Sequence, residues 1–349
     1  MQEIFVVKLL YEEREKMKIK RLVKRYYPLV MLLIFAATML WGIATTVAKS
    51  PTLASTLLHP DTLKIVQLTD VHYSSHGTNK GARMRACSGA LLQDAVCQIN
   101  AMPDVDVVVF SGDSIDTPDK QNLIEFAKIA NNLKYPWYNA LGNHEAGVCG
   151  GLSKEKYFQV LSSINLNYST FAFLKPYYVI TPKKDYKVIF LDGVIDSKIS
   201  ANGYFSAEQL AWFDKKLTDY SDKKVIVVQH FPVVEPIKSP SHKILNDAEY
   251  LKVLDKHHNV VAVLAGHYHC PRVVKRNGVV HVATSALVQY PNAFRVITIY
   301  EEPTGTKVKI ETVETNLKDV QAQSKAALGA KAKYVAVTPK NSTFILCCP

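Results

Sequence analysis

Cysteine is scarce in this chain, which contains only six in 349 residues. That number does not make a disulfide framework for a domain of this length. Cys149 and Cys270 follow two of the motifs described below and could pair if the domain is exported; two free thiols beside the site are an equal alternative. Stability is therefore expected to come from a hydrophobic core, for which an apolar content of 48% is sufficient.

Internal repeats are also absent, so one large domain with flanking pieces is the simplest organisation. The net charge is +11, and residues 1–27 supply +4 of it through eight Lys and Arg against four Glu. The remaining basic excess is spread along the chain. It suits anionic substrates, and it is equally typical of an ordinary solvated surface.

No charged residue lies between Pro28 and Ala48, directly after the basic cluster from Lys18 to Tyr27. A helix of about 20 residues spans the hydrocarbon core, whereas the apolar part of a signal peptide runs to about 7–15. We therefore expect a cytoplasmic basic segment over 1–27 and a transmembrane signal anchor over 28–48, with the rest extracytoplasmic (periplasmic, extracellular or lumenal). The alternative is a signal peptide cleaved after Ala48, which would give a secreted protein.

Five short apolar runs are each followed closely by Asp, Asn or His. Such runs predict buried strands, and open sheets bind their ligands at the carboxyl ends of strands. The runs are Leu63 to Thr69, Asp106 to Phe110, Pro136 to Leu141, Val225 to Gln229 and Val261 to Ala265. The polar residues after them are Asp70, His72, Asp113, Asp116, Asn143, His144, His230, His267 and His269. We expect these side chains to gather at one edge.

The residue types indicate a metal site. Carboxylates, imidazoles and one amide without cysteine suit Mn, Fe, Zn or Co better than Ca or a thiolate zinc site. The number of ligands is sufficient for two ions, and a carboxylate can bridge ions about 3.5–4 Å apart.

The ordered motifs resemble those of the calcineurin-like metallophosphoesterases. They are D-x-H at Asp70, G-D-x-x-D at Gly112, G-N-H-E at Gly142, a single His230 and G-H-x-H at Gly266, within about Leu63 to Ala286. The resemblance implies an α/β fold of the four-layer αββα sandwich type, which we place at residues 62–315 behind the N-terminal transmembrane helix.

The resemblance also implies a role for each motif residue. Two divalent transition-metal ions are expected, with Asp113 bridging them. His144 is the implied catalytic residue, oriented by Asp116. The implied ligands of the first ion are Asp70, His72 and His269, and those of the second are Asn143, His230 and His267.

The implied reaction is hydrolysis of a phosphate ester, in which a hydroxide bridging the metals attacks phosphorus and His144 assists the departing oxygen. Asp116 stands where iron-containing purple acid phosphatases have tyrosine, which disfavours that subgroup. The closing His-x-His is similar to the cyclic-nucleotide and glycerophosphodiester phosphodiesterase branch. We expect a phosphodiesterase acting on a small phosphorylated substrate. A phosphomonoesterase, a nuclease with nucleic acid as its partner, and a non-catalytic membrane-tethered scaffold are the alternatives.

Other patterns complete the expected fold. Ser206 and Gln209 form a capping box before a helix, and Asn277-Gly278 predicts a hairpin turn. Residues 168–180 predict a strand, and residues 316–349 predict a weakly ordered tail. The loop 73–85 either receives substrate phosphate or is merely solvated; its polar residues are His76, Asn79, Lys80, Arg83 and Arg85.

Overall fold

The computed structural model describes residues 61–145, 151–169, 175–337 and 341–346. These ranges hold the predicted catalytic domain apart from two short internal segments. The predicted basic segment and anchor, residues 1–48, lie outside the described residues, as do Cys149, Cys347 and Cys348. Among the described helices, none has the length and apolar character needed to span a membrane.

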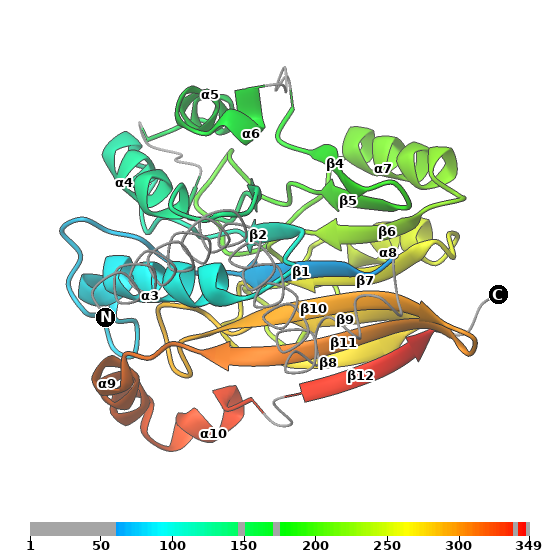
Figure 1. The fold of residues 1–349 in the computed structure, drawn as a ribbon. Helices are drawn as coiled ribbons and strands as arrows, with labels where there is room; N and C mark the ends of the chain where they lie inside the picture. Colours follow the sequence, from blue (N-terminus) through cyan, green and yellow to red (C-terminus); the bar gives the residue numbers. More distant parts are fainter. Residues whose placement is uncertain (1–60, 146–150, 170–174, 338–340, 347–349) are drawn as a thin grey trace, which may run out of the picture. The chain divides into compact units, whose positions relative to one another are not determined.

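The first of two mixed sheets has the order β12-β11-β10-β1-β2-β3 (Figure 1). Strands β1, β2 and β3 run parallel, and β10, β11 and β12 are antiparallel to their neighbours. The parallel strands are almost fully buried, as an apolar strand covered on both faces should be. The bounds are β1 Leu63–Leu68, β2 Val107–Ser111, β3 Trp137–Ala140, β10 Ala293–Glu302, β11 Gly305–Glu314 and β12 Asn341–Leu346.

The second sheet has the order β4-β5-β6-β7-β9-β8. Its four inner strands are parallel, and β4 and β8 pair antiparallel at the two edges. All residues of β7 are buried. The bounds are β4 Tyr178–Lys183, β5 Tyr186–Phe190, β6 Lys224–Val228, β7 Val260–Ala265, β8 Arg272–Arg276 and β9 Val279–Ala283.

Helices accompany both sheets. Beside the first sheet, helix α3 contacts α4 and α4 contacts α5 (Figure 1). Beside the second sheet, α7 contacts α8. The expected pair of sheets flanked by helices is therefore present. The bounds are α3 Ser88–Ala101, α4 Lys120–Ala130, α5 Lys154–Ile164, α6 Leu166–Ser169, α7 Ala207–Asp219, α8 Asp247–Leu254, α9 Lys318–Leu328 and α10 Ala332–Val335.

Buried polar contacts join the two sheets near the strand ends. Gln67 of β1 donates to the carbonyl of Ala265 of β7 at 3.0 Å and accepts from Thr284 at 2.8 Å. These three residues are buried, so both polar ends of the Gln67 amide are satisfied where water is excluded. This contact fixes the end of β1 against the end of β7, and both strands deliver metal-ligand candidates.

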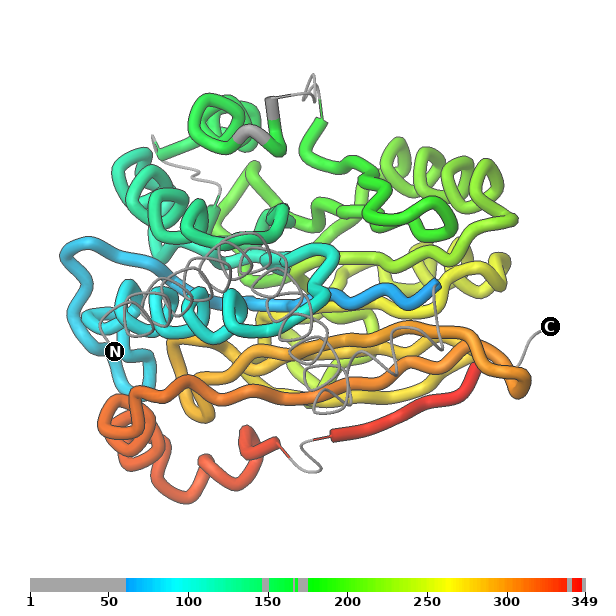
Figure 2. Tube along the Cα trace, viewed as in Figure 1, coloured from blue at the N-terminus to red at the C-terminus, as the bar shows by residue number. Residues whose placement is uncertain are grey.

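The prediction of a weakly ordered tail is wrong for two segments beyond residue 316. Helix α9 forms because its Lys, Gln and Ala residues are good helix formers, and Ser324 ties it to Tyr290 N at 2.7 Å and Ala82 O at 2.6 Å. Strand β12 then pairs with β11 and forms the edge strand of the first sheet (Figure 2).

Two local predictions also need correction. The segment predicted as a strand over 168–180 begins within helix α6, and β4 starts only at Tyr178. In α7, the Ser206 hydroxyl accepts from Gln209 N as predicted, at 3.1 Å. The Gln209 side chain does not complete the capping box, because it bonds both the N–H and the C=O of Asp192.

Candidate metal centre

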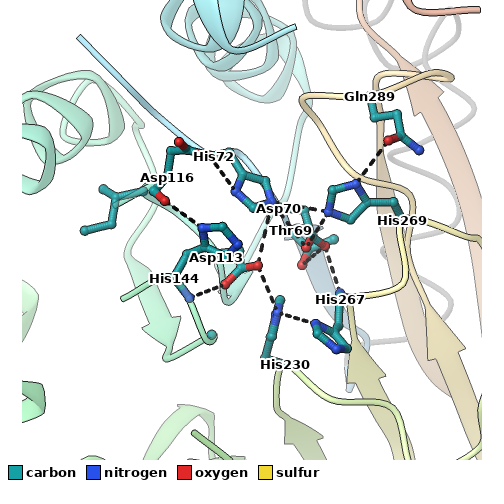
Figure 3. A network of polar contacts seen from close by, with 12 residues as sticks. Thr69, Asp70, His72, Asp113, Asp116, His144, His230, His267, His269 and Gln289 are labelled. Carbon is teal, nitrogen blue, oxygen red and sulfur yellow. Dashed lines mark hydrogen bonds and ion pairs between the residues drawn. The ribbon is translucent and has the colours of Figure 1, made fainter. Parts of the chain in front are cut away.

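The polar residues that follow β1, β2, β3, β6 and β7 meet at one edge of the sandwich (Figure 3). Glycines of the motifs permit this close approach. A Cβ at Gly142 would overlap the carboxylate of Asp113, and a Cβ at Gly266 would overlap Thr69 and Asp70. Only a residue without a Cβ therefore lets the chain pass this close to the site at Gly142 and Gly266.

The first group of donors comprises Asp70, His72 and His269, all buried. The Nε2 atoms of His72 and His269 lie 3.2 Å apart, and Asp70 Oδ1 lies 3.1 Å from His269 Nε2. Apart from this contact with His269, Asp70 Oδ1 has no partner within hydrogen-bond distance among the described residues. Two ring nitrogens and a buried carboxylate oxygen directed at one volume fit a cation, since an empty arrangement of this kind is costly.

The second group comprises Asp113, His230 and His267. His230 Nε2 lies 3.1 Å from His267 Nδ1 and 3.2 Å from Asp113 Oδ2. The same Oδ2 lies 3.6 Å from His72 Nε2 of the first group. Asp113 therefore stands between the two groups, as a bridging carboxylate must.

Asn143 follows β3 at the same edge. Its Oδ1 is buried and has no hydrogen-bond partner among the described residues. The next residue, His144, donates its backbone N–H to Asp113 Oδ1 at 2.9 Å, so the segment after β3 lies against the bridging carboxylate. An unpaired amide oxygen at this position fits the expected seventh ligand.

Burial and neighbouring charges set the proton affinities of the histidines. Burial lowers the pKa of His72 to about 4 in spite of its hydrogen bond with Asp116. Burial opposes the charge on His230 as well, but the charge and hydrogen bond of Asp113 outweigh it and raise the pKa of His230 to about 9. The charge and hydrogen bond of His230 in turn hold the pKa of Asp113 well below its usual range against the effect of its burial. Asp113 is therefore ionised and ready to bind a cation.

His144 is held in a different way from the one that the resemblance implied. Its Nδ1 contacts the backbone carbonyl of Asp116 at 2.6 Å, and because a carbonyl only accepts, Nδ1 carries the proton. The carboxylate of Asp116 instead faces His72 Nδ1 at 3.3 Å and Arg85 Nη1 at 2.5 Å. The backbone carbonyl of Asp116 thus orients the His144 ring, and the Asp116 carboxylate contacts the His72 ring.

Sequence reasoning missed Glu145, the last residue of G-N-H-E. Its carboxylate is fully buried and accepts backbone N–H groups of Asp113 at 2.8 Å, Gly142 at 2.5 Å and Ile115 at 3.1 Å. Burial, together with the charge of Asp113, raises the pKa of Glu145 to about 7. Glu145 joins the β2 and β3 motifs, and its place in the tetrapeptide was the one signal available.

His242 was also missed, because it lies in the loop between β6 and α8 without a motif. Its ring lies 5.3 Å from the ring of His267, and its Nδ1 contacts the hydroxyls of Ser239 at 3.1 Å and Ser241 at 2.9 Å. In the loop 73–85, Arg85, one of the candidates for phosphate binding, forms an ion pair with Asp116.

Cys270 is a free thiol in the structure, and Cys149, its candidate partner if the domain is exported, lies outside the described residues.

Comparisons with known proteins agree on the class of fold. A family model described as calcineurin-like phosphoesterase matches residues 63–271. A crystal structure of a dimetal phosphatase from Danio rerio superposes with a TM-score of 0.58 at 21% identity, over 72% of this chain and 96% of the other. At this identity the superposition supports the fold.

Curated relatives share parts of the same region. A protein from Xenorhabdus bovienii named as a probable cyclic nucleotide phosphodiesterase is 24% identical over 64% of this chain and 86% of its own. A protein from Arcobacter nitrofigilis, named as a probable glycerophosphodiester phosphodiesterase, is 27% identical over 59% of this chain and 71% of its own length. A manganese-dependent ADP-ribose/CDP-alcohol diphosphatase from Xenopus tropicalis is 36% identical, over 29% of this chain and 31% of its own.

Proposed function

The chain belongs to the calcineurin-like phosphoesterase family and is a hydrolase acting on phosphoric ester bonds, and from this premise we propose that it is a phosphodiesterase with two divalent transition-metal ions. The observation that carries the proposal is the position of Asp113 Oδ2, 3.6 Å from His72 Nε2 and 3.2 Å from His230 Nε2. One carboxylate is thus shared by two groups of donors. In this proposal each group, together with Asp113, holds one ion.

Two such ions, when bound, lower the pKa of water and neutralise charge on phosphoryl oxygens, and Mn, Fe, Zn and Co all suit the ligands. The protein contributes the proton donor. With Nδ1 bonded to the Asp116 carbonyl, the Nε2 of His144 is the ring nitrogen left to assist the departing oxygen. A scaffold without catalysis is disfavoured because every ligand of the motif set and His144 are present in the chain.

The names of the relatives favour a diester as the substrate. Two of them are named for cyclic nucleotides and glycerophosphodiesters, and we infer that this chain hydrolyses a small diester of either kind. The diphosphatase relatives make a nucleotide diphosphate the main competitor, since those from Xenopus are 36% identical to this chain, although over a shorter stretch of 107 residues. A phosphomonoesterase or a nuclease would use the same metal centre.

Two measurements on the full chain test the proposal. Protein loaded with Mn and then desalted should retain close to two ions per chain by elemental analysis, and fewer than one in folded protein would contradict it. The loaded protein should then hydrolyse bis(p-nitrophenyl) phosphate and a natural diester faster than p-nitrophenyl phosphate, ADP-ribose or single-stranded DNA. A preference for any of the last three would replace the diester assignment by the corresponding class.

We further propose that residues 28–48 anchor the protein with its catalytic domain outside the cytoplasm. The support is the uncharged stretch of 21 residues directly after a basic cluster. Fractionation of cells followed by protease treatment of intact membranes tests the topology. A full-length protein in the soluble fraction, or a domain protected on the cytoplasmic side, would contradict it, and a shortened soluble form outside the cytoplasm would indicate cleavage after Ala48.

A further inference from the structure

Arg85 lies beside the metal centre without contacting any of the seven expected ligands. It begins the short 3-10 turn Arg85–Cys87, and its carbonyl accepts from the hydroxyl of Ser88 at 2.8 Å. Its Nη1 lies 2.5 Å from Asp116 Oδ2. The Arg85 side chain is 21% exposed and that of Asp116 is 5% exposed, so this ion pair is largely shielded from water. A shielded pair constrains both partners more than a surface pair does.

Asp116 uses its other oxygen on a metal-ligand candidate. Its Oδ1 lies 3.3 Å from Nδ1 of His72. Both atoms are buried, and neither has another hydrogen-bond partner among the described residues. The chain of contacts therefore runs from Arg85 through Asp116 to His72 (Figure 3 shows its last two members).

The chain of contacts fixes which nitrogen of His72 is available. A carboxylate at Nδ1 holds the proton there, so the lone pair resides on Nε2, which faces Asp113 at 3.6 Å and His269 at 3.2 Å. A neutral His72 contributes no net charge to Asp116. The cation that pairs with this buried carboxylate is Arg85, whose removal would leave Asp116 free to turn away from His72.

We propose that Arg85 is a positioning residue for the first ion of the metal centre: through Asp116 it orients His72 and so sets the affinity of that one ion. This inference rests on the proposed function, because it presupposes two ions. It also separates the metal from the proton donor. His144 depends on the backbone carbonyl of Asp116, which remains when Arg85 is replaced.

The competing assignment for Arg85 is direct contact with substrate phosphate. The geometry favours positioning, because Nη1 is already committed at 2.5 Å to Asp116. Arg83, two residues earlier, forms no ion pair within the described ranges and is the better candidate for binding phosphate. The two assignments differ in what they change: positioning changes metal affinity, and phosphate contact changes KM when the metal sites are full.

The test is a Co²⁺ titration of the metal-free full chain, followed by visible absorption and checked by elemental analysis. Arg85→Met should weaken one of the two binding steps by about 10–100-fold, as removal of partners behind a ligand typically does. The second step should stay within about twofold of the wild type. Arg85→Lys, which keeps the charge, should fall between Arg85→Met and the wild type. Excess metal should restore most of the activity.

Arg276→Met is the matched control, because Arg276 pairs with Asp255 at 2.5 Å on the surface and contacts no expected ligand. It removes the same charge and should leave both steps unchanged. Should Arg85→Met fail to fold, Arg85→Gln replaces it, and the same weakening of one step is required. Both steps unchanged in the folded variant, with a raised KM at full metal occupancy, would assign Arg85 to substrate and overturn the inference. A wild-type chain that binds fewer than two ions would instead contradict the proposed function.

Discussion

Replacing His144 with alanine should produce a loss of activity that depends on the leaving group. The backbone N–H of His144, which alanine retains, is the group that bonds Asp113 at 2.9 Å. The imidazole itself is bonded to the Asp116 carbonyl and is not one of the expected ligands. Metal content and folding should therefore remain close to those of the wild type, and the loss should fall on the chemical step.

The size of the loss follows from the role. General acid assistance contributes about 10²–10⁴-fold, or about 2.7–5.4 kcal/mol of transition-state stabilisation. An alkoxide leaving group needs a proton, so an alkyl diester should show the full loss in kcat/KM. A nitrophenolate is stable without a proton, so a nitrophenyl diester should lose clearly less.

The assay compares kcat/KM for an alkyl diester and a nitrophenyl diester at equal metal occupancy. Equal losses on both substrates would refute proton donation and would assign His144 to binding of the phosphoryl group. Loss of a metal ion would place it among the ligands. Asp116→Asn serves as the comparison, because the Asp116 carboxylate faces His72 and not His144. This variant should lose the same factor of kcat/KM on both substrates and should bind metal more weakly.

Two further predictions concern buried groups outside the ligand set. Glu145→Gln places an NH₂ group against backbone N–H donors and should lower the free energy of unfolding by about 1.5–3 kcal/mol. The control Glu155→Gln changes an exposed side chain and should leave the free energy of unfolding unchanged. Equal urea midpoints for the two variants would contradict the prediction. His281 has a pKa lowered to about 4 by burial, so the unfolded chain takes up a proton near pH 6.5 before the folded chain does, and stability falls as the pH drops from 6.5 to 4. His281→Leu should remove about 3 kcal/mol of that fall, and parallel pH profiles of unfolding for variant and wild type would count against it.

The position of the candidate site was predictable because it depends on topology. Parallel strands end at a common edge, so a carboxylate or imidazole that follows each of them must lie near the others. The motif at Asp70, the motif at Asp113 and the pair His267 and His269 meet in the structure for this reason. Buried apolar runs also located the strands that carry them to within one or two residues.

The contacts behind the ligands were not predictable, because they depend on side-chain and backbone directions that spacing does not encode. Asp116 could serve His144 with its carboxylate or its carbonyl, and one motif is compatible with both. Arg85 is separated from Asp116 by 31 residues, and nothing local indicates their pairing. Gln209 likewise had a local role in a capping box but bonds Asp192, 17 residues away, because that buried backbone needed partners.

The backbone at the ligands is itself strained, which permits a test that does not depend on activity. Non-glycine residues rarely adopt a positive φ, yet five of the expected ligands do: Asp70 at 50°, His72 at 45°, Asp113 at 51°, His267 at 72° and His269 at 51°.

At position 269, glycine relieves this strain and alanine does not. Both substitutions remove the same ring, so in metal-free buffer with a chelator His269→Gly should be more stable than His269→Ala by about 1 kcal/mol. His230 is not among the described residues with a positive φ. At that position the alanine variant should therefore be more stable than the glycine variant, by about 0.5–1 kcal/mol. Chemical unfolding of the four variants measures both differences. The same order at both positions would show that the backbone at 269 stores no strain, whereas opposite orders would mean that the fold gives up stability to direct the ligands at the metals.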